Sequence, residues 1–316
     1  MRLPIVGIGA GLVAALLFSV VITGSPLALL LYSASPLPIF IASLGWNHRS
    51  GLVATVAGGL GVALALTPAA GVAFALIIAL PAWWIAYLSL LARGDEGGRT
   101  EWYPLGNLML WIAGTAALAT IGSALLMSTD YEAYRAVIAR IVENLLNEMV
   151  RAKLIALSGE ADIKQMADTL APVVPVGIGA SFVTTIAVNL WLAAKTVQMS
   201  GRLPRPWPFI PSATLPRRAL VLMLGGLAAA SLGGFVGVGG AALIGALLCA
   251  FTLTGLAMLH DLSRGRPWRT PMLISVYVAL ILMQAVVTPI LALVGLIDTL
   301  LGLRKRAAMP PPPNQS

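Results

Sequence analysis

Few side chains in this chain have a type and spacing that could do chemistry. Its 316 residues include two histidines, His48 and His260, and one cysteine, Cys249. The HExxH pattern of zinc proteases and the glycine-rich phosphate loop of ATPases are both absent. A nucleophile must lie within hydrogen-bond reach of its base, but Ser181 and His260 fall near opposite ends of their predicted spans. We therefore expect no catalytic residue, no metal site and no cofactor, and an enzyme is the least favoured function.

Polar side chains inside long apolar segments are better candidates for binding, because an unpaired polar group in hydrocarbon is costly. Asn189 and Gln284 are of this kind, and Trp83 and Trp84 follow Pro81 in an interrupted apolar segment of the type that often lines transporter sites. We predict a ligand pocket formed by Trp83, Trp84, Asn189 and Gln284. The alternative is a structural role, in interhelical hydrogen bonds for the amides and in the core or the lipid-facing surface for the tryptophans.

The composition of the chain indicates that these residues belong to a membrane protein. Hydrophobic residues make up 59% of the chain and charged residues 10%, whereas soluble domains carry about 25% charged residues. The apolar blocks are 4–24, 27–45, 51–67, 70–92, 105–127, 173–194, 219–236, 241–260 and 272–303. Blocks of this length exclude a soluble protein, a single-pass anchor and an outer-membrane barrel. They predict an all-α, polytopic protein of the bacterial cytoplasmic membrane, with residues 1–303 as one membrane domain.

The last block decides the number of membrane segments. Residues 272–303 would form a helix of about 48 Å, against a hydrocarbon core of about 30 Å. Thr288-Pro289 lies at its midpoint, so we favour two helices, 272–287 and 290–303, for ten segments with both termini in the cytoplasm. The alternative is one tilted span that ends near residue 293, for nine segments and an amphipathic tail on the outer surface. The basic and proline-rich end, 304–316, is predicted to be disordered.

The net charge of +8 is interpreted as a topology signal rather than as a nucleic-acid site, because the cations flank the spans. With the N-terminus inside, the predicted inner loops are 46–50, 93–104, 195–218 and 261–271. One cluster, His260, Asp261 and Arg264, could dock a cytoplasmic protein or an anionic headgroup; the alternative is a solvated loop. Asp298, the charged residue within the apolar blocks, is expected to pair with a cation of 304–306.

The predicted outer segment 130–170 is amphipathic. Its apolar residues recur every three or four positions: Tyr131, Tyr134, Ile138, Ile141, Leu145 and Met149. Ser158-Gly159 is expected to separate two helices. We favour helices that lie on the outer leaflet, and a lid over a cavity between the spans is the alternative.

Several strings, in this order, resemble those of the YybS-like predicted membrane proteins, a family of unknown function. They are Ala79-Leu80-Pro81-Ala82-Trp83-Trp84, Trp102-Tyr103-Pro104, Asn189-Leu190-Trp191-Leu192-Ala193 and Gly295-Leu296-Ile297-Asp298. That family is distantly similar to the S components of energy-coupling-factor transporters and to the rod-shape protein MreD. The first resemblance implies that Ala10 and Ala14, an Ala-x-x-x-Ala pattern on the first span, contact a coupling subunit. The chain departs from S components in its larger number of spans and its long outer segment, and no ligand residue is carried over.

Two functions follow as hypotheses. The first is a solute-binding or transport subunit that needs a separate energising partner, and it predicts a closed, polar-lined cavity. The second is an MreD-like scaffold for envelope assembly, and it predicts a tightly packed interior whose polar residues pair with one another. In both, the expected partners are the lipid bilayer and a membrane or cytoplasmic protein, not nucleic acid.

Overall fold

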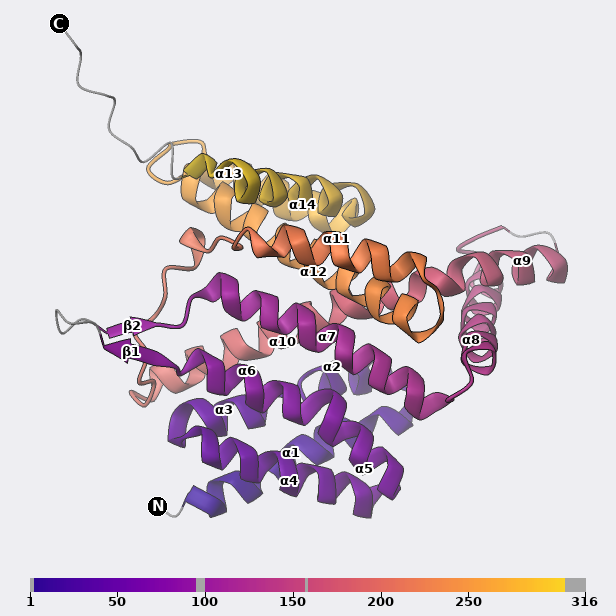
Figure 1. Cartoon of the computed structure of the whole chain (residues 1–316), viewed down its shortest axis with the longest axis horizontal. Coiled ribbons are helices and arrows are strands. Elements are labelled where there is room, and N and C mark those ends of the chain that lie inside the picture. The colour runs from indigo at the N-terminus through magenta and orange to yellow at the C-terminus, as the bar shows by residue number, and fades with distance from the viewer. Residues whose placement is uncertain (1–2, 95–99, 157–158, 305–316) are drawn as a thin grey trace, which may run out of the picture.

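The computed structural model describes residues 3–94, 100–156 and 159–304, and these residues are predominantly helical. Most helices lie side by side along one direction (Figure 1). The strands among the described residues are one antiparallel hairpin, β1 (Ala92–Gly94) and β2 (Thr100–Trp102).

The first part of the bundle contains two interrupted spans. Its helices are α1 (Leu3–Ser19), η1 (Val20–Thr23), α2 (Pro26–Ser33), α3 (Leu37–Trp46), α4 (His48–Ala65), α5 (Pro68–Phe74), η2 (Ala75–Ala79) and α6 (Leu80–Ser89). α2 does not continue into α3, because Pro36 and Pro38 lack the backbone N–H groups of a continuous helix. The helix is therefore interrupted between Ser33 and Leu37. η2 is a π-helical stretch just before Pro81, and Thr55 donates a hydrogen bond to the carbonyl of Ala79 within it (3.3 Å).

The second part is built around one long central helix. Its helices are α7 (Leu105–Met127), α10 (Val174–Met199), η4 (Ile210–Ser212), α11 (Arg218–Ser231), α12 (Gly234–Leu262), α13 (Arg269–Leu282) and α14 (Gln284–Leu301). α12 packs against α7, α10, α11 and α14. Its glycines allow this, since a Cβ on Gly245 would overlap the backbone of α10, and one on Gly255 the backbone of α14.

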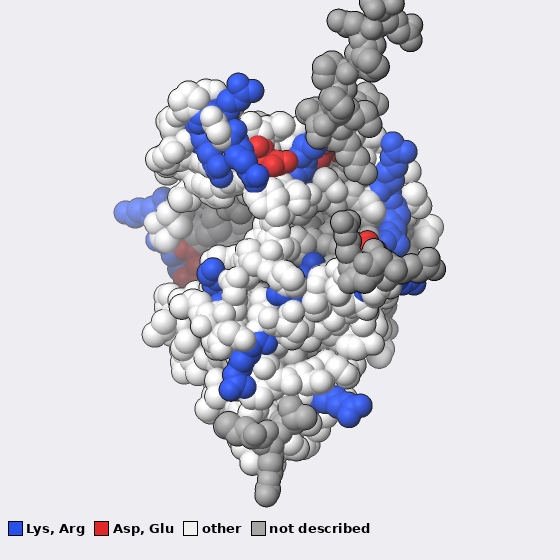
Figure 2. All heavy atoms as spheres, turned by 90° about the vertical axis from the view of Figure 1, so that its left-hand side faces the viewer, with Lys and Arg blue, Asp and Glu red and all other residues white. Residues whose placement is uncertain are grey.

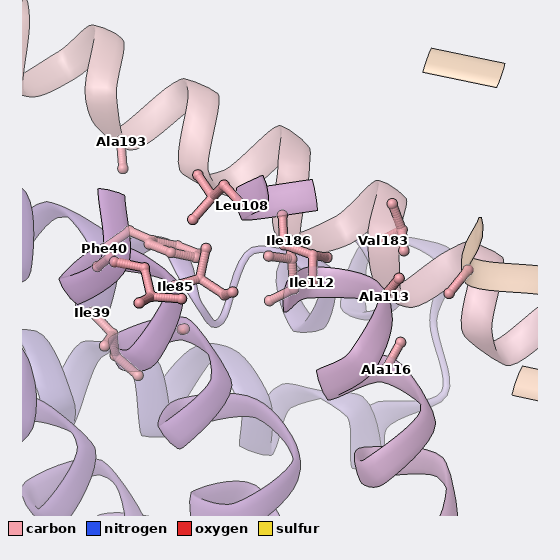
Figure 3. Close-up of a cluster of buried hydrophobic side chains, with 14 of the residues drawn as sticks. Ile39, Phe40, Ile85, Leu108, Ile112, Ala113, Ala116, Val183, Ile186 and Ala193 are labelled. Carbon is pink, nitrogen blue, oxygen red and sulfur yellow. The ribbon is translucent and has the colours of Figure 1, made fainter. Parts of the chain in front are cut away.

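Between α3, α6, α7 and α10 the interior is filled by hydrophobic side chains (Figure 3). Phe40, Ile85 and Ile186 are at most 2% exposed and come from three of these helices. This dense core occupies the region of the predicted ligand pocket.

The all-α, polytopic fold class is confirmed. Among the described residues, seven helices are long and apolar enough to cross a membrane. Three other packed helices are not among these seven. α11 and α13 are apolar but shorter, and α4 begins with two polar residues, His48 and Arg49. The ten-segment count stays a prediction.

The predicted break at Thr288-Pro289 is wrong. The chain turns at Met283, and Pro289 lies in the second turn of α14, where its missing N–H costs one helical hydrogen bond. α14 stays helical past this proline because it packs closely on α12, as the contact between Gly295 and the carbonyl of Phe251 shows.

Basic residues gather at one end of the bundle, which we call the basic end (Figure 2). It contains the β1–β2 hairpin, the 200–217 loop, the 263–268 loop and the end of α14. By the positive-inside rule we expect this end to face the cytoplasm.

The opposite end contains α8 (Tyr131–Arg151), α9 (Glu160–Leu170) and η3 (Ala171–Val173). One stripe of α8, including Tyr134 and Ile138, is buried against α9 and α12. Ile141 and Leu145, which we predicted on the same apolar face, lie on a different stripe and are 53% and 60% exposed. This exposed apolar stripe suits contact with a membrane surface, although that location stays a prediction.

Cysteine labelling in a Cys249→Ala background tests the topology. A membrane-impermeant maleimide should label Lys164→Cys on α9 and Gln284→Cys at the α13–α14 turn in intact cells, because both positions are exposed at the end opposite the basic one. Arg266→Cys should be labelled only after lysis. Failure to label Gln284→Cys from either side would contradict the ten-segment topology, since residue 284 would then lie within the bilayer.

Candidate functional site

Trp83 and Trp84 belong to an aromatic cluster near the basic end of α6. The indole N–H of Trp83 donates to the carbonyl of His48 (2.9 Å), and its ring lies nearly parallel to that of Tyr87, 6.1 Å away. Trp84 meets Trp111 of α7 edge to face, 5.5 Å between centroids. These contacts attach α6 to the start of α4 and to α7, so the two tryptophans have the geometry of packing residues.

Asn189, by contrast, lies directly against the break between α2 and α3. Its amide nitrogen donates to the carbonyl of Ser33 and to that of Thr185, both at 2.8 Å. In a continuous helix the Ser33 carbonyl would accept from the N–H of Leu37, but at the break this N–H donates to the carbonyl of Ala34 (3.0 Å). In the described chain no backbone N–H bonds to the Ser33 carbonyl. Asn189 therefore supplies the donor that the break removed.

Two buried polar atoms remain unpaired beside this break. The Oδ1 atom of Asn189 and the hydroxyl of Ser35 have no hydrogen-bond partner among the described residues. Asn189 is 4% exposed and Ser35 is 0% exposed. Because Asn189 uses both amide hydrogens, its Oδ1 is a free acceptor, whereas the Ser35 hydroxyl can donate and accept.

Gln284 does not join these residues, and it does not lie inside an apolar helix as predicted. It is the first residue of α14 and is exposed, because the chain turns at Met283. α14 packs mainly on α12 and α13, away from α6. The structure thus places Trp83 and Trp84 in one cluster, Asn189 at a helix break and Gln284 at a surface turn, with no shared cavity among the residues it describes.

The predicted docking residues on α1 face inward. Ala14 is 0% exposed and Ala10 is half-buried, while Ile8 and Leu12 form part of the exposed face. A coupling subunit could reach Ala14 only if α1 moved away from its neighbours. Their docking role stays a prediction.

His260, Asp261 and Arg264 lie together at the basic end of α12. A His260 ring nitrogen lies 2.9 Å from the hydroxyl of Tyr277 on α13, and the Arg264 guanidinium lies 4.0 Å from the centroid of the Phe209 ring. These contacts join α12 to α13 and to the 200–217 loop. Partner binding by the cluster stays a prediction.

The 200–217 loop is fastened to the bundle by arginines. Arg205 donates to the carbonyl of Ser89 at the end of α6 (3.1 Å), and burial lowers the pKa of its guanidinium. The Arg202 guanidinium stacks on Trp46, 4.7 Å from the ring centroid. Several cations of this end are thus structural.

Asp298 and Arg304 form a buried ion pair, which we call the C-terminal latch. Their closest side-chain atoms are 2.7 Å apart, with 3% and 8% of the side chains exposed. Arg304 also donates to the carbonyls of Pro211 (2.6 Å) and Ala213 (2.9 Å), so it ties α14 to the 200–217 loop. The pairing of Asp298 with a residue of 304–306 agrees with our expectation; the loop carbonyls could not be predicted from the sequence.

A family model described as predicted membrane protein (DUF2232) matches residues 12–299. No curated protein and no solved structure matches the chain significantly.

Proposed function

The chain belongs to the DUF2232 family of predicted membrane proteins, and we propose that it is a non-catalytic subunit that binds a small solute at the break between α2 and α3. The observation that carries the proposal is the pair of unpaired buried polar atoms, Asn189 Oδ1 and Ser35 Oγ. Leaving such a group unsatisfied costs about 1–3 kcal/mol. A bound molecule that donates a hydrogen bond to Asn189 would remove this cost.

The surroundings of the break favour an uncharged group. α2, α3 and α10 up to Ala194 contain no Lys, Arg, Asp or Glu. A charged group would therefore enter without a counter-charge from these helices, at a high desolvation cost. A hydroxyl or amide N–H of the solute fits better.

The break also has a short path to the bilayer. Ser33, whose carbonyl bonds to Asn189, is itself exposed, and the apolar side chains of Leu29 and Leu30 nearby on α2 are 59% and 68% exposed. A solute could thus reach the site sideways from the lipid. Because the chain has no phosphate loop, an energy-coupled role would need a separate partner.

The test uses protein from the native host in nanodiscs, with mass spectrometry of retained small molecules. The Ser35→Ala variant removes one unpaired hydroxyl but keeps the Asn189–Ser33 bond, and it should lower retention about tenfold. Ser275→Ala on α13 is the matched control and should retain as much as the wild type. If the wild type retains nothing and Ser35→Ala raises the melting temperature, the hydroxyl is merely unsatisfied and the proposal fails.

An MreD-like scaffold is the second candidate. The dense core of α3, α6, α7 and α10 and the paired tryptophan cluster favour it, because a scaffold needs no cavity there. Under this hypothesis Ser35→Ala would leave the proteins that co-purify unchanged. Recovery of cell-wall or division proteins would favour the scaffold, and recovery of an ATPase pair with a coupling subunit would favour transport.

A further inference from the structure

A separate pocket opens at the basic end, far along the chain from the α2–α3 break. Its volume is about 520 Å³. It lies between the first turn of α7, the 214–217 segment before α11 and the last turn of α14. None of the residues predicted from the sequence to bind a ligand lines it.

The walls of this pocket are held in place by polar contacts. The C-terminal latch forms one wall, because Asp298 and Arg304 both line the pocket. On another side, Arg218 donates to the Oδ1 atom of Asn107 at 2.6 Å. Gly106 lets α7 approach the carbonyl of Thr214, which a Cβ would overlap.

The charge of the lining is positive. Asp298 and Arg304 neutralise each other, and Arg304 has further donors committed to two loop carbonyls. Arg217 also lines the pocket, is exposed, and has no hydrogen-bond or ion-pair partner among residues 3–94, 100–156 and 159–304. Arg218, its neighbour, adds a second cation next to the pocket. An occupant would therefore lie beside Arg217, a cation with no partner among the described residues.

From this geometry we propose that the pocket binds a phosphate group. A guanidinium recognises phosphate oxygens with two parallel hydrogen bonds, and Arg217 is free to make them. The pocket lies where helices α7, α11 and α14 start or end, close to Trp102 and Tyr103, and such residues and helix ends mark the membrane interface. The phosphate could belong to an anionic lipid headgroup or to a soluble molecule from the cytoplasm.

The experiment compares the full chain with Arg217→Gln and with the control Arg266→Gln, which removes the same charge from an exposed position outside the pocket. The lipid arm measures phosphatidylglycerol retained after delipidation, by native mass spectrometry. The soluble arm measures the shift of melting temperature in detergent with inorganic phosphate or glycerol 3-phosphate. Phosphatidylcholine and sulfate-free buffer serve as the blanks.

If the proposal holds, one arm gives binding that Arg217→Gln weakens about tenfold and Arg266→Gln leaves unchanged. Binding in the lipid arm identifies a headgroup, and binding in the soluble arm identifies a free phosphate compound. Equal losses in the two variants would mean general attraction to the basic end and would overturn the proposal, as would no binding in either arm. Because Ser35→Ala does not touch this pocket, failure here leaves the proposed solute site untouched.

Discussion

Replacement of Gly245 with alanine is expected to destabilise the protein by about 3 kcal/mol, because there is no room for a Cβ. A methyl group at this position would overlap the carbonyl oxygen and the Cα of Val176 on α10. Both are backbone atoms, so no side chain can rotate away and the two helices must separate. α12 also contacts α7, α11 and α14, and the displacement would spread through the second part of the bundle. Thermal unfolding in detergent, with size-exclusion chromatography, measures the effect.

Gly114→Ala and Gly225→Ala are the matched controls. Each glycine lies inside a helix, α7 or α11, and an added Cβ would meet no described atom within 4 Å. Since alanine is a better helix former than glycine by up to about 1 kcal/mol, these variants should be as stable as the wild type or more so. Equal stability of Gly245→Ala and Gly225→Ala would show that α10 and α12 are not in backbone contact.

The contrast between these glycines marks a limit of prediction from the sequence. Hydropathy places most helices within a few residues, because a helix in lipid needs a continuous apolar run. It does not say which helices are neighbours, so Gly245 looks no different from Gly225 until α10 is seen beside it. The α13–α14 turn was misplaced for a related reason: Met283 is apolar, whereas Pro289, the expected helix breaker, is held within a helix by packing on α12.

At the candidate site, too, the sequence predicts some features and others are seen only in the structure. The cost of a polar group in hydrocarbon singles out Asn189 from the sequence, and the structure shows an interruption beside it, between α2 and α3. That the amide of Asn189 meets the carbonyl freed by this interruption required the structure, since the two positions are 156 residues apart. The prediction for Trp83 and Trp84 rests on aromatic side chains that follow an interruption at Pro81, and this pattern suits a packed cluster as well as a pocket.

Replacement of Arg304 with alanine is expected to cost about 3–5 kcal/mol of stability, since it breaks a buried ion pair from one side. The Asp298 carboxylate would stay buried without its counter-charge, and the carbonyls of Pro211 and Ala213 would lose their donors. α14 and the 200–217 loop should then separate. Thermal unfolding should show a large drop in melting temperature, and trypsin should cut the loop faster after Arg202.

A double-mutant cycle separates the ion pair from the loop contacts. The variant Asp298→Asn with Arg304→Ala no longer buries an unpaired charge, so it should be more stable than Arg304→Ala alone. Arg304→Lys keeps the charge but cannot reach the carboxylate and both carbonyls as a planar fork does, and its stability should be intermediate. If the single and double variants were equally unstable, the carboxylate would contribute nothing. The latch would then consist only of hydrogen bonds to the loop, which would still hold the wall of the phosphate pocket in place.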